Sequence, residues 1–235
     1  MPLHLTRPEG EVCRIGHRPD TWAWVPWEYA PFTGRWDDPQ ALFRTVYAAS
    51  SPEAGFAEIL AQFRPDHGLD DDLAAIERSP EDDGFPSRLP GSLGMDWVRS
   101  RRLGFARVDG RFADIGHSST IAELRPVFLS AALAYGLQDF DAAAIRVHAP
   151  RAFTQLISRH LYQQLLDDGA FLSGVAFASR HGDDLRLWAV YEREADAGRD
   201  RSHLLCECHD EDIDPRGPAF QRALALHGLT LEDAS

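Results

Sequence analysis

Glu58 is a carboxylate with small neighbours at three helically spaced positions. In a helix, the residues at i−4, i−3 and i+3 are Ala54, Gly55 and Ala61. A carboxylate framed in this way leaves a hollow that a ligand can enter, where it could stabilise positive charge or activate a nucleophile. The alternative is a solvated helix glutamate, which is the usual place for this residue type.

Tyr47 is a large ring among small strand residues. Val46 precedes it, and Ala48 and Ala49 follow it. The open space beside the ring would allow it to stack on a heterocycle. The alternative is a tyrosine that packs in the core.

Arg35 follows a glycine, which gives its loop the freedom to approach a ligand closely. A guanidinium in such a loop can form a bidentate contact with a phosphate. The alternative is a salt bridge to Asp37 or Asp38. Later in the chain, Ser179 and Arg180 could bring a hydroxyl and a second guanidinium to the same cleft, although serine is also a common turn residue.

The charge balance narrows the chemistry further. Among 235 residues there are 37 acidic and 24 basic side chains, a formal net charge of −13, and every basic residue is arginine. A lysine Schiff base, a lysine general base and a phosphate-binding lysine are therefore excluded. An acidic chain is also a poor candidate for direct nucleic-acid binding, which requires clustered positive charge. Any phosphate contact must therefore come from backbone N–H groups or arginines.

The sequence predicts a reduced, cytoplasmic protein. No apolar run approaches the roughly 18 residues of a membrane-spanning helix, and the N-terminus lacks a signal-peptide pattern. The three cysteines, Cys13, Cys206 and Cys208, are an odd number and favour free thiols. No set of ligands has the spacing of a metal site, so we expect no metal.

Hydrophobic periodicity and turn residues predict mixed secondary structure. Strands are expected over residues 44–49, 103–108, 111–115, 172–178, 185–191 and 203–208, and helices over 51–63, 120–135, 151–167 and 218–227. Asp109-Gly110 is a typical two-residue hairpin turn, so residues 103–115 are expected to form a hairpin. Ser51 is the expected N-cap of its helix, and Thr120 with Glu123 resembles a capping box.

Hairpins mixed with helices favour an α+β fold, with a mainly antiparallel sheet core and flanking helices. We expect residues 1–33 to form an irregular arm, rich in Trp and Pro, that buries aromatic rings. Residues 34–193 would form the catalytic domain, with an acidic excursion over 66–94 that contains a short helix near residues 73–76. Residues 194–235 would add a strand and a helix packed on the same domain.

Several segments together resemble one known family. They are Gly34-Arg35-Trp36-Asp37-Asp38-Pro39, residues 44–58, residues 151–155, Ser179-Arg180-His181-Gly182 and residues 187–192. Over about residues 30–193 they resemble the RES-domain family, which is named for an arginine, a glutamate and a serine. The corresponding residues here would be Arg35, Glu58 and Ser179, with Tyr47 as a fourth site residue.

The resemblance implies a fold similar to that of ADP-ribosyltransferase toxins and an activity that degrades NAD⁺. It also implies the toxin of a bacterial toxin–antitoxin pair, whose partner is an antitoxin with an Xre-like DNA-binding domain. In this interpretation Glu58 stabilises the ribose cation, Tyr47 stacks on nicotinamide and Ser179 hydrogen-bonds the ribose or nicotinamide. Arg35 binds the pyrophosphate, with Arg44 and Arg180 as further cationic contacts.

Other functions stay open at this point. A protein-modifying mono-ADP-ribosyltransferase and a non-catalytic NAD-binding or interaction protein are the alternatives. The sequence does not distinguish hydrolysis of NAD⁺ from phosphorolysis, and it leaves the oligomeric state open, a homodimer included. The acidic residues 66–84 are a candidate surface for a basic antitoxin.

Overall fold

The computed structural model describes residues 2–65, 90–146 and 149–232, and its centre is an eight-stranded sheet in the order β1-β6-β7-β8-β3-β2-β5-β9. The strands are β1 (Leu5–Thr6), β2 (Val12–His17), β3 (Thr45–Ala49), β5 (Arg101–Val108), β6 (Phe112–Asp114), β7 (Gly174–Ser179), β8 (Gly182–Tyr191) and β9 (Leu205–Asp212). All neighbouring pairs are antiparallel except β6 and β7. The α+β class with a mainly antiparallel sheet is therefore confirmed.

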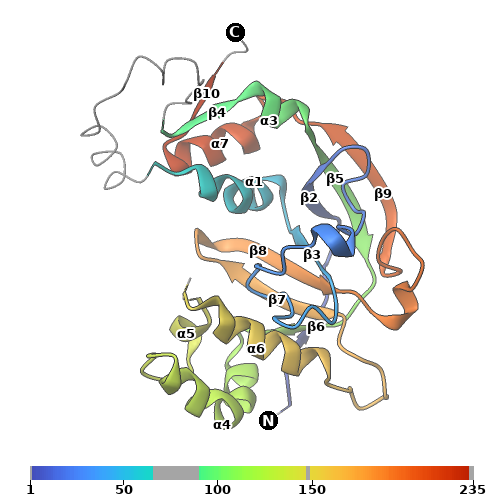
Figure 1. Ribbon diagram of the computed structural model, residues 1–235, viewed down its shortest axis with the longest axis vertical. Helices are drawn as coiled ribbons and strands as arrows, with labels where there is room; N and C mark the ends of the chain where they lie inside the picture. The colour runs from blue at the N-terminus through green and yellow to red at the C-terminus, as the bar shows by residue number, and fades with distance from the viewer. Residues whose placement is uncertain (1, 66–89, 147–148, 233–235) are drawn as a thin grey trace.

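Helices lie at both ends of the molecule (Figure 1). Near one end, α1 (Pro52–Leu60) and α7 (Pro218–His227) lie beside a two-stranded parallel sheet and α3. At the other end are the remaining helices, and the β7–β8 hairpin runs between the two groups. The other elements are β4 (Ser92–Gly94), β10 (Thr230–Glu232), α3 (Met95–Arg99), α4 (Ser118–Ala134), α5 (Ala142–Arg146) and α6 (Arg151–Tyr162). Among the described residues, no helix is long and apolar enough to cross a membrane.

The helix that carries Glu58 forms as its sequence predicts. The Ser51 side chain accepts a hydrogen bond from the Ala54 N–H, and Pro52 occupies the first turn, where its missing N–H costs nothing. Phe56 and Leu60 are buried on one face of this helix, and a 3₁₀ turn over Ala61–Phe63 ends it. The short β3–α1 connection therefore fixes where Glu58 stands relative to Tyr47.

The first 33 residues are not an irregular arm throughout. Val12–His17 form β2, which pairs with β5 over six residues inside the main sheet. The sequence pattern does not predict this strand, because Gly16, the charged Arg14 and the polar His17 interrupt the apolar alternation. The expected burial of aromatic rings is confirmed for Trp22 and Trp24, which are 1% and 5% exposed.

The predicted hairpin over residues 103–115 is wrong. β5 pairs with β2 and β9, whereas β6 pairs with β1 and lies parallel to β7, so β5 and β6 never meet. At the bend, the Asp109 N–H donates to the Leu204 carbonyl, and Arg111 exchanges hydrogen bonds with Ser173. These long-range partners take the backbone groups that a two-residue turn would have paired locally.

Two predicted helix boundaries also change. The capping box at Thr120 is wrong, because α4 begins at Ser118 and the His117 side chain accepts a hydrogen bond from the Ser119 N–H. Thr120 lies inside the helix, where its hydroxyl accepts from the His4 N–H. The helix predicted over 151–167 ends at Tyr162 instead.

The last part of the chain has the expected hairpin, strand and helix, but its strand is shifted from the predicted 203–208 and β10 was not predicted. The β7–β8 hairpin is present, residues 205–212 form a strand, and α7 spans the predicted residues 218–227. Phe220 and Leu224 of α7 pack with Phe56 and Leu60 of α1 in one apolar cluster. The short helix predicted near residues 73–76 and the acidic excursion lie mostly outside the described residues.

Candidate functional site

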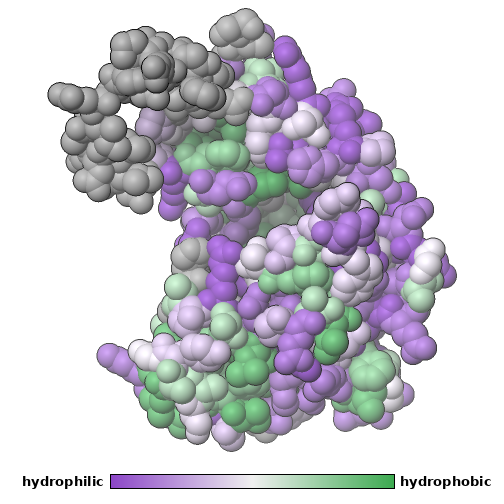
Figure 2. Space-filling view, in the orientation of Figure 1, coloured by the Kyte–Doolittle hydropathy of each residue, from purple (hydrophilic) through white to green (hydrophobic). Residues whose placement is uncertain are grey.

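A cavity of about 580 Å³ opens between α1, β3 and the β7–β8 hairpin, within the size range of small-molecule sites. Figure 2 shows the molecular surface hollowed on this side, between the α1 and β8 regions located in Figure 1. Its lining includes the side chains Arg14, Arg35, Tyr47, Glu58, Gln62, Arg151, Phe177 and Arg180. Among the described lining residues there are four arginines and one carboxylate, so the cavity favours an anionic ligand.

Glu58 and Ser179 meet at the wall of the cavity. The Ser179 hydroxyl donates to the Glu58 Oε1, although 121 residues separate the two along the chain. The His181 N–H in turn donates to Ser179 Oγ at 2.9 Å. The hairpin end of β7 therefore holds the serine, and the serine holds the carboxylate of α1 in one orientation. The second carboxylate oxygen has no hydrogen bond in this network.

Arg35 lines the same cavity from the loop before β3. One of its Nη atoms donates to the Ile145 carbonyl, and its guanidinium lies 5.6 Å from the centre of the Phe177 ring. Its buried Nε has no hydrogen-bond partner among the described residues. Burial lowers the pKa of Arg35, and the nearby Glu58 carboxylate opposes this shift. The expected alternative of a salt bridge to Asp37 or Asp38 is not formed.

Tyr47 holds the loop that carries Arg35. Its hydroxyl donates to Asp37 Oδ1 at 2.9 Å and accepts from the Trp36 N–H at 2.9 Å. Burial, together with the Asp37 carboxylate, raises the pKa of the phenol well above its usual value. A Cβ on Gly34 would collide with this hydroxyl and with Asp37, so the loop requires glycine at this position. The Tyr47 ring lines the cavity while its hydroxyl is fully engaged.

The family relationship follows from a scan against family models. The model described as the RES domain matches residues 11–212. The chain belongs to the RES-domain family. A search of curated proteins returned no match. Among solved structures, the chain is similar to the crystal structure of the M. tuberculosis MbcT–MbcA toxin–antitoxin complex, with 18% identity and a TM-score of 0.47 over 94% of this chain and 92% of that one.

In this RES-domain chain the structure brings together five of the predicted site residues. Arg35, Tyr47, Glu58 and Arg180 line the cavity, and Ser179 reaches it through Glu58. Arg180 is exposed, and its Nε donates to the His181 ring at 3.2 Å. Residues from four separate segments of the chain thus converge on a single hollow.

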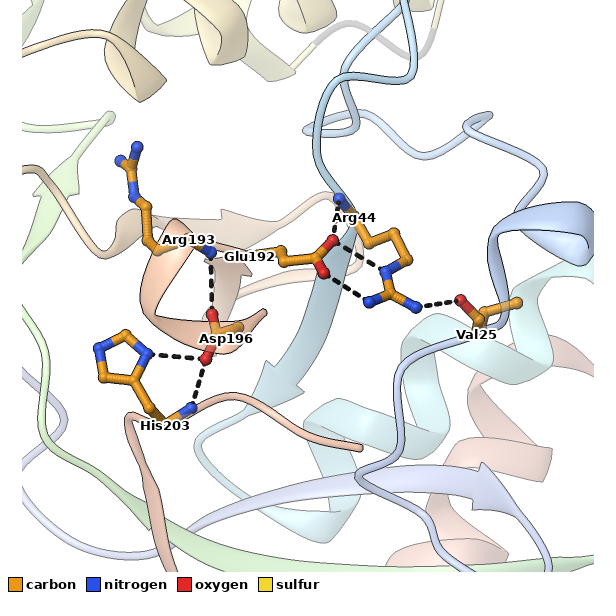
Figure 3. A network of polar contacts seen from close by, with 6 residues as sticks. All are labelled: Val25, Arg44, Glu192, Arg193, Asp196 and His203. Carbon is orange, nitrogen blue, oxygen red and sulfur yellow. Dashed lines mark hydrogen bonds and ion pairs between the residues drawn. The ribbon is translucent and has the colours of Figure 1, made fainter. Parts of the chain in front are cut away.

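Arg44 is not brought to this cavity. Its guanidinium forms a two-point contact with the Glu192 carboxylate and donates to the Val25 carbonyl at 3.1 Å (Figure 3). Trp24 and Trp27 flank it, with ring centres at 5.3 and 4.9 Å. Only 13% of the Arg44 side chain is exposed. Each of its guanidinium nitrogens donates to Glu192 or Val25, so the protein itself occupies these donors.

The structure adds two arginines that the residue patterns did not single out. Arg14 of β2 donates to the Tyr47 carbonyl at 3.4 Å, its Nε is buried without a partner in the described chain, and burial lowers its pKa to about 10. Arg151, at the start of α6, donates to the Thr33 carbonyl at 2.7 Å. Arg14 lies in residues 1–33, which were predicted to be an irregular arm and not a strand. Arg151 begins residues 151–155, one of the segments that resemble the family, so that resemblance could have identified it.

A larger cavity of about 790 Å³ lies elsewhere and is lined in part by Tyr162, Phe171 and Arg193. It holds none of the predicted site residues. The Arg193 guanidinium there lies 3.9 Å from the Tyr162 ring centre and donates to the carbonyls of Leu172 and Tyr162. The smaller cavity is the candidate site, because its described lining includes the predicted site residues Arg35, Tyr47, Glu58 and Arg180. No group of three His, Cys, Asp or Glu in the described chain is arranged to hold a metal ion.

Proposed function

We propose that this RES-domain protein binds NAD⁺ in the arginine-lined cavity and cleaves the bond between nicotinamide and ribose. The observation that carries the proposal is that, in the described lining of the cavity, one carboxylate, Glu58, is held by Ser179 and accompanied by four arginines. This charge pattern suits a ligand such as NAD⁺, which carries a negatively charged pyrophosphate and whose ribose becomes positively charged during cleavage. The family resemblance described above points to the same substrate.

The arginines would bind the anionic part of the substrate. The Arg35 side chain lines the cavity, and its buried Nε has no hydrogen-bond partner among the described residues, while Arg180 and Arg151 are exposed at the cavity wall. Guanidinium groups form paired hydrogen bonds with phosphate oxygens, and these bonds are stronger than neutral ones. We assign the pyrophosphate mainly to Arg35. The Tyr47 hydroxyl and the Gly34 N–H both donate to Asp37, and these hydrogen bonds fix the loop of Arg35 before a ligand binds.

Glu58 would act at the reacting carbon. Nicotinamide leaves with the electron pair of the C–N bond, so no general acid is required, and positive charge develops on the ribose as in glycoside cleavage. A carboxylate at fixed distance stabilises this charge without reorganising. The acceptor, water or phosphate, then forms the new bond to the ribose carbon, and Glu58 can take the proton that a water molecule releases.

Ser179 and Tyr47 would orient the participants. Ser179 keeps the carboxylate from rotating, and it acts on the substrate through Glu58 because its own side chain is buried. The Tyr47 ring offers an apolar face against which nicotinamide can stack. Its hydroxyl is already engaged with Asp37 and Trp36, so we assign it no proton transfer.

Product analysis tests this proposal and separates its variants. The purified protein is incubated with NAD⁺ labelled in the adenosine part, with and without phosphate, and the products are resolved by chromatography. Nicotinamide with ADP-ribose indicates hydrolysis, and ADP-ribose 1″-phosphate indicates phosphorolysis. Label that appears on a protein indicates a mono-ADP-ribosyltransferase. Unchanged NAD⁺ at high enzyme concentration contradicts the catalytic proposal and leaves a binding protein.

We further propose that the protein acts as the toxin of a toxin–antitoxin pair, as the family resemblance implies. Loss of cellular NAD⁺ would arrest growth. Induced expression in a bacterial host is expected to lower the NAD⁺ pool and stop growth, and Glu58→Gln should do neither. Rescue by a basic, DNA-binding protein encoded beside it would identify the antitoxin, whereas normal growth with a full NAD⁺ pool would contradict the toxin assignment.

A further inference from the structure

We propose that His227, at the end of α7, is a positioning residue for Glu58; this inference rests on the proposed function. The family match ends at residue 212, so α7 lies beyond it. Neither the sequence pattern nor the family resemblance gave this histidine a role. Two separate sets of contacts connect its imidazole to the proposed catalytic carboxylate.

The first connection runs through the helix that carries Glu58. Ala57 precedes the glutamate and lies in the last turn of α1. His227 Nε2 lies 2.6 Å from the Ala57 carbonyl oxygen, and Arg64 Nε lies 2.6 Å from His227 Nδ1. Because arginine can only donate, Nδ1 must accept and Nε2 must carry the proton. The neutral imidazole therefore ties the end of α1 to the turn that follows it.

The second connection runs through the β7–β8 hairpin. The His227 and His181 rings meet edge to face, with their centres 4.9 Å apart. The His181 N–H donates to Ser179 Oγ, and Ser179 donates to Glu58. His227 therefore contacts both elements that fix the carboxylate, the helix below it and the hairpin end beside it.

The position of His227 is itself well determined. Its side chain is buried, with the residue 4% exposed. Phe220 packs edge-on against Phe56 with ring centres 5.2 Å apart, and Arg222 pairs with Glu53 across the same helix interface. These contacts dock α7 on α1 independently of the histidine. The histidine can therefore be changed without removing the helix from its place.

The charged groups around His227 keep it neutral. Burial lowers its pKa most, the Arg64 and Arg180 guanidinium groups lower it further, and the Ala57 carbonyl and Glu58 oppose the shift. The neutral form is the one that can accept from Arg64 and donate to Ala57 at the same time. This electrostatic setting agrees with a structural hydrogen-bonding role and not with proton transfer.

Three variants of the full chain test the inference by steady-state NAD⁺ consumption. In His227→Gln, the side-chain amide can still donate a hydrogen bond to the Ala57 carbonyl. His227→Leu removes this hydrogen-bond donor and replaces the imidazole with an apolar side chain of similar size. Phe220→Leu weakens the docking of α7 but leaves His227 in place and is the matched control for stability. Because small displacements of a catalytic group carry large costs, we expect His227→Leu to lower kcat 10- to 100-fold. KM should change less than about twofold, because the arginines remain.

The same series contains the outcomes that overturn the inference. His227→Gln should retain most of the wild-type kcat. Phe220→Leu should have the wild-type kcat once the rate is divided by the concentration of folded protein. A purely structural role is indicated if Phe220→Leu loses as much kcat as His227→Leu, or if both histidine variants are equally impaired. A rise in KM alone would assign His227 to binding.

If the wild type does not consume NAD⁺, the proposed function fails. Hydrogen exchange then tests whether His227 positions the end of α1 and the hairpin end. His227→Leu should expose residues 56–63 and 179–182 more than Phe220→Leu does, and equal exchange would contradict the inference.

Discussion

Two groups of arginines in this molecule differ in what occupies their donors. At the cavity, Arg35 has a buried Nε without a partner in the part of the chain that the structure describes, and Arg180 is exposed and lines the same cavity as Glu58. At the Arg44–Glu192 pair, each donor group has a protein partner and two tryptophan rings flank the guanidinium (Figure 3). In a chain without lysine, arginine must serve both as a structural cation and as a ligand-binding one. The state of its donors, not its residue type, separates the two uses.

The largest expected effect comes from removing the charge of Glu58. Glu58→Gln keeps the shape and leaves an oxygen for the Ser179 hydroxyl, so the fold should be retained. Loss of the charge that stabilises the ribose cation should lower kcat for NAD⁺ by at least about 100-fold. Nicotinamide release measured by chromatography checks this, with thermal unfolding as the control. Activity within a few fold of the wild type would remove Glu58 from the mechanism.

Arg35→Met should produce the next largest effect. Methionine retains much of the apolar stem against Trp36 and Phe177 but cannot bind phosphate. Hydrogen bonds to charged groups contribute about 1.5–3 kcal/mol, which corresponds to roughly a 10- to 100-fold loss in kcat/KM. Initial rates over a range of NAD⁺ concentrations measure it. An unchanged kcat/KM would mean that another arginine holds the pyrophosphate.

Glu192→Ala should damage stability and leave catalysis intact, which sets it apart from the cavity variants. It leaves the Arg44 guanidinium, 13% exposed, without its carboxylate. Breaking a largely buried pair on one side costs about 2 kcal/mol or more, which for a chain of this size lowers Tm by roughly 4–8 °C. Calorimetry measures Tm, and NAD⁺ kinetics below the transition serve as the control. A raised KM for NAD⁺ with normal stability would instead return Arg44 to the substrate site.

A further effect is expected in the pH dependence of stability. Burial and the neighbouring Arg180 lower the pKa of His181 to about 4 from its ordinary value of 6.5. Because the unfolded chain then binds the proton more readily, this contribution is complete above pH 6.5 and is lost as the pH falls toward 4. His181→Asn should flatten the fall in unfolding free energy between pH 7 and pH 4.5, measured with urea. An identical slope in both proteins would contradict the shift.

Local rules predicted the elements whose partners lie nearby. Ser51-Pro52 specified the start of α1, and two apolar segments, residues 172–178 and 185–191, joined by polar residues 181–184, specified the β7–β8 hairpin. Asp109-Gly110 led to the wrong prediction of a hairpin, because the strands on either side of it pair with distant segments. Turn residues carry no information about such long-range partners. Arg14 escaped because its strand alternates weakly, so only the pairing with β5 reveals it. The site residues that share one cavity were identifiable mainly through spacing that resembles a family, since no local pattern states that Ser179 meets Glu58.

The most direct test of the central claim is a crystal structure of Glu58→Gln in complex with NAD⁺. We expect intact NAD⁺ in the cavity of about 580 Å³, with a phosphate oxygen within hydrogen-bond distance of the Arg35 guanidinium. The bond between nicotinamide and ribose should lie between residue 58 and the Tyr47 ring. NAD⁺ bound in the Arg193 cavity, or an empty site at saturating NAD⁺, would contradict the account.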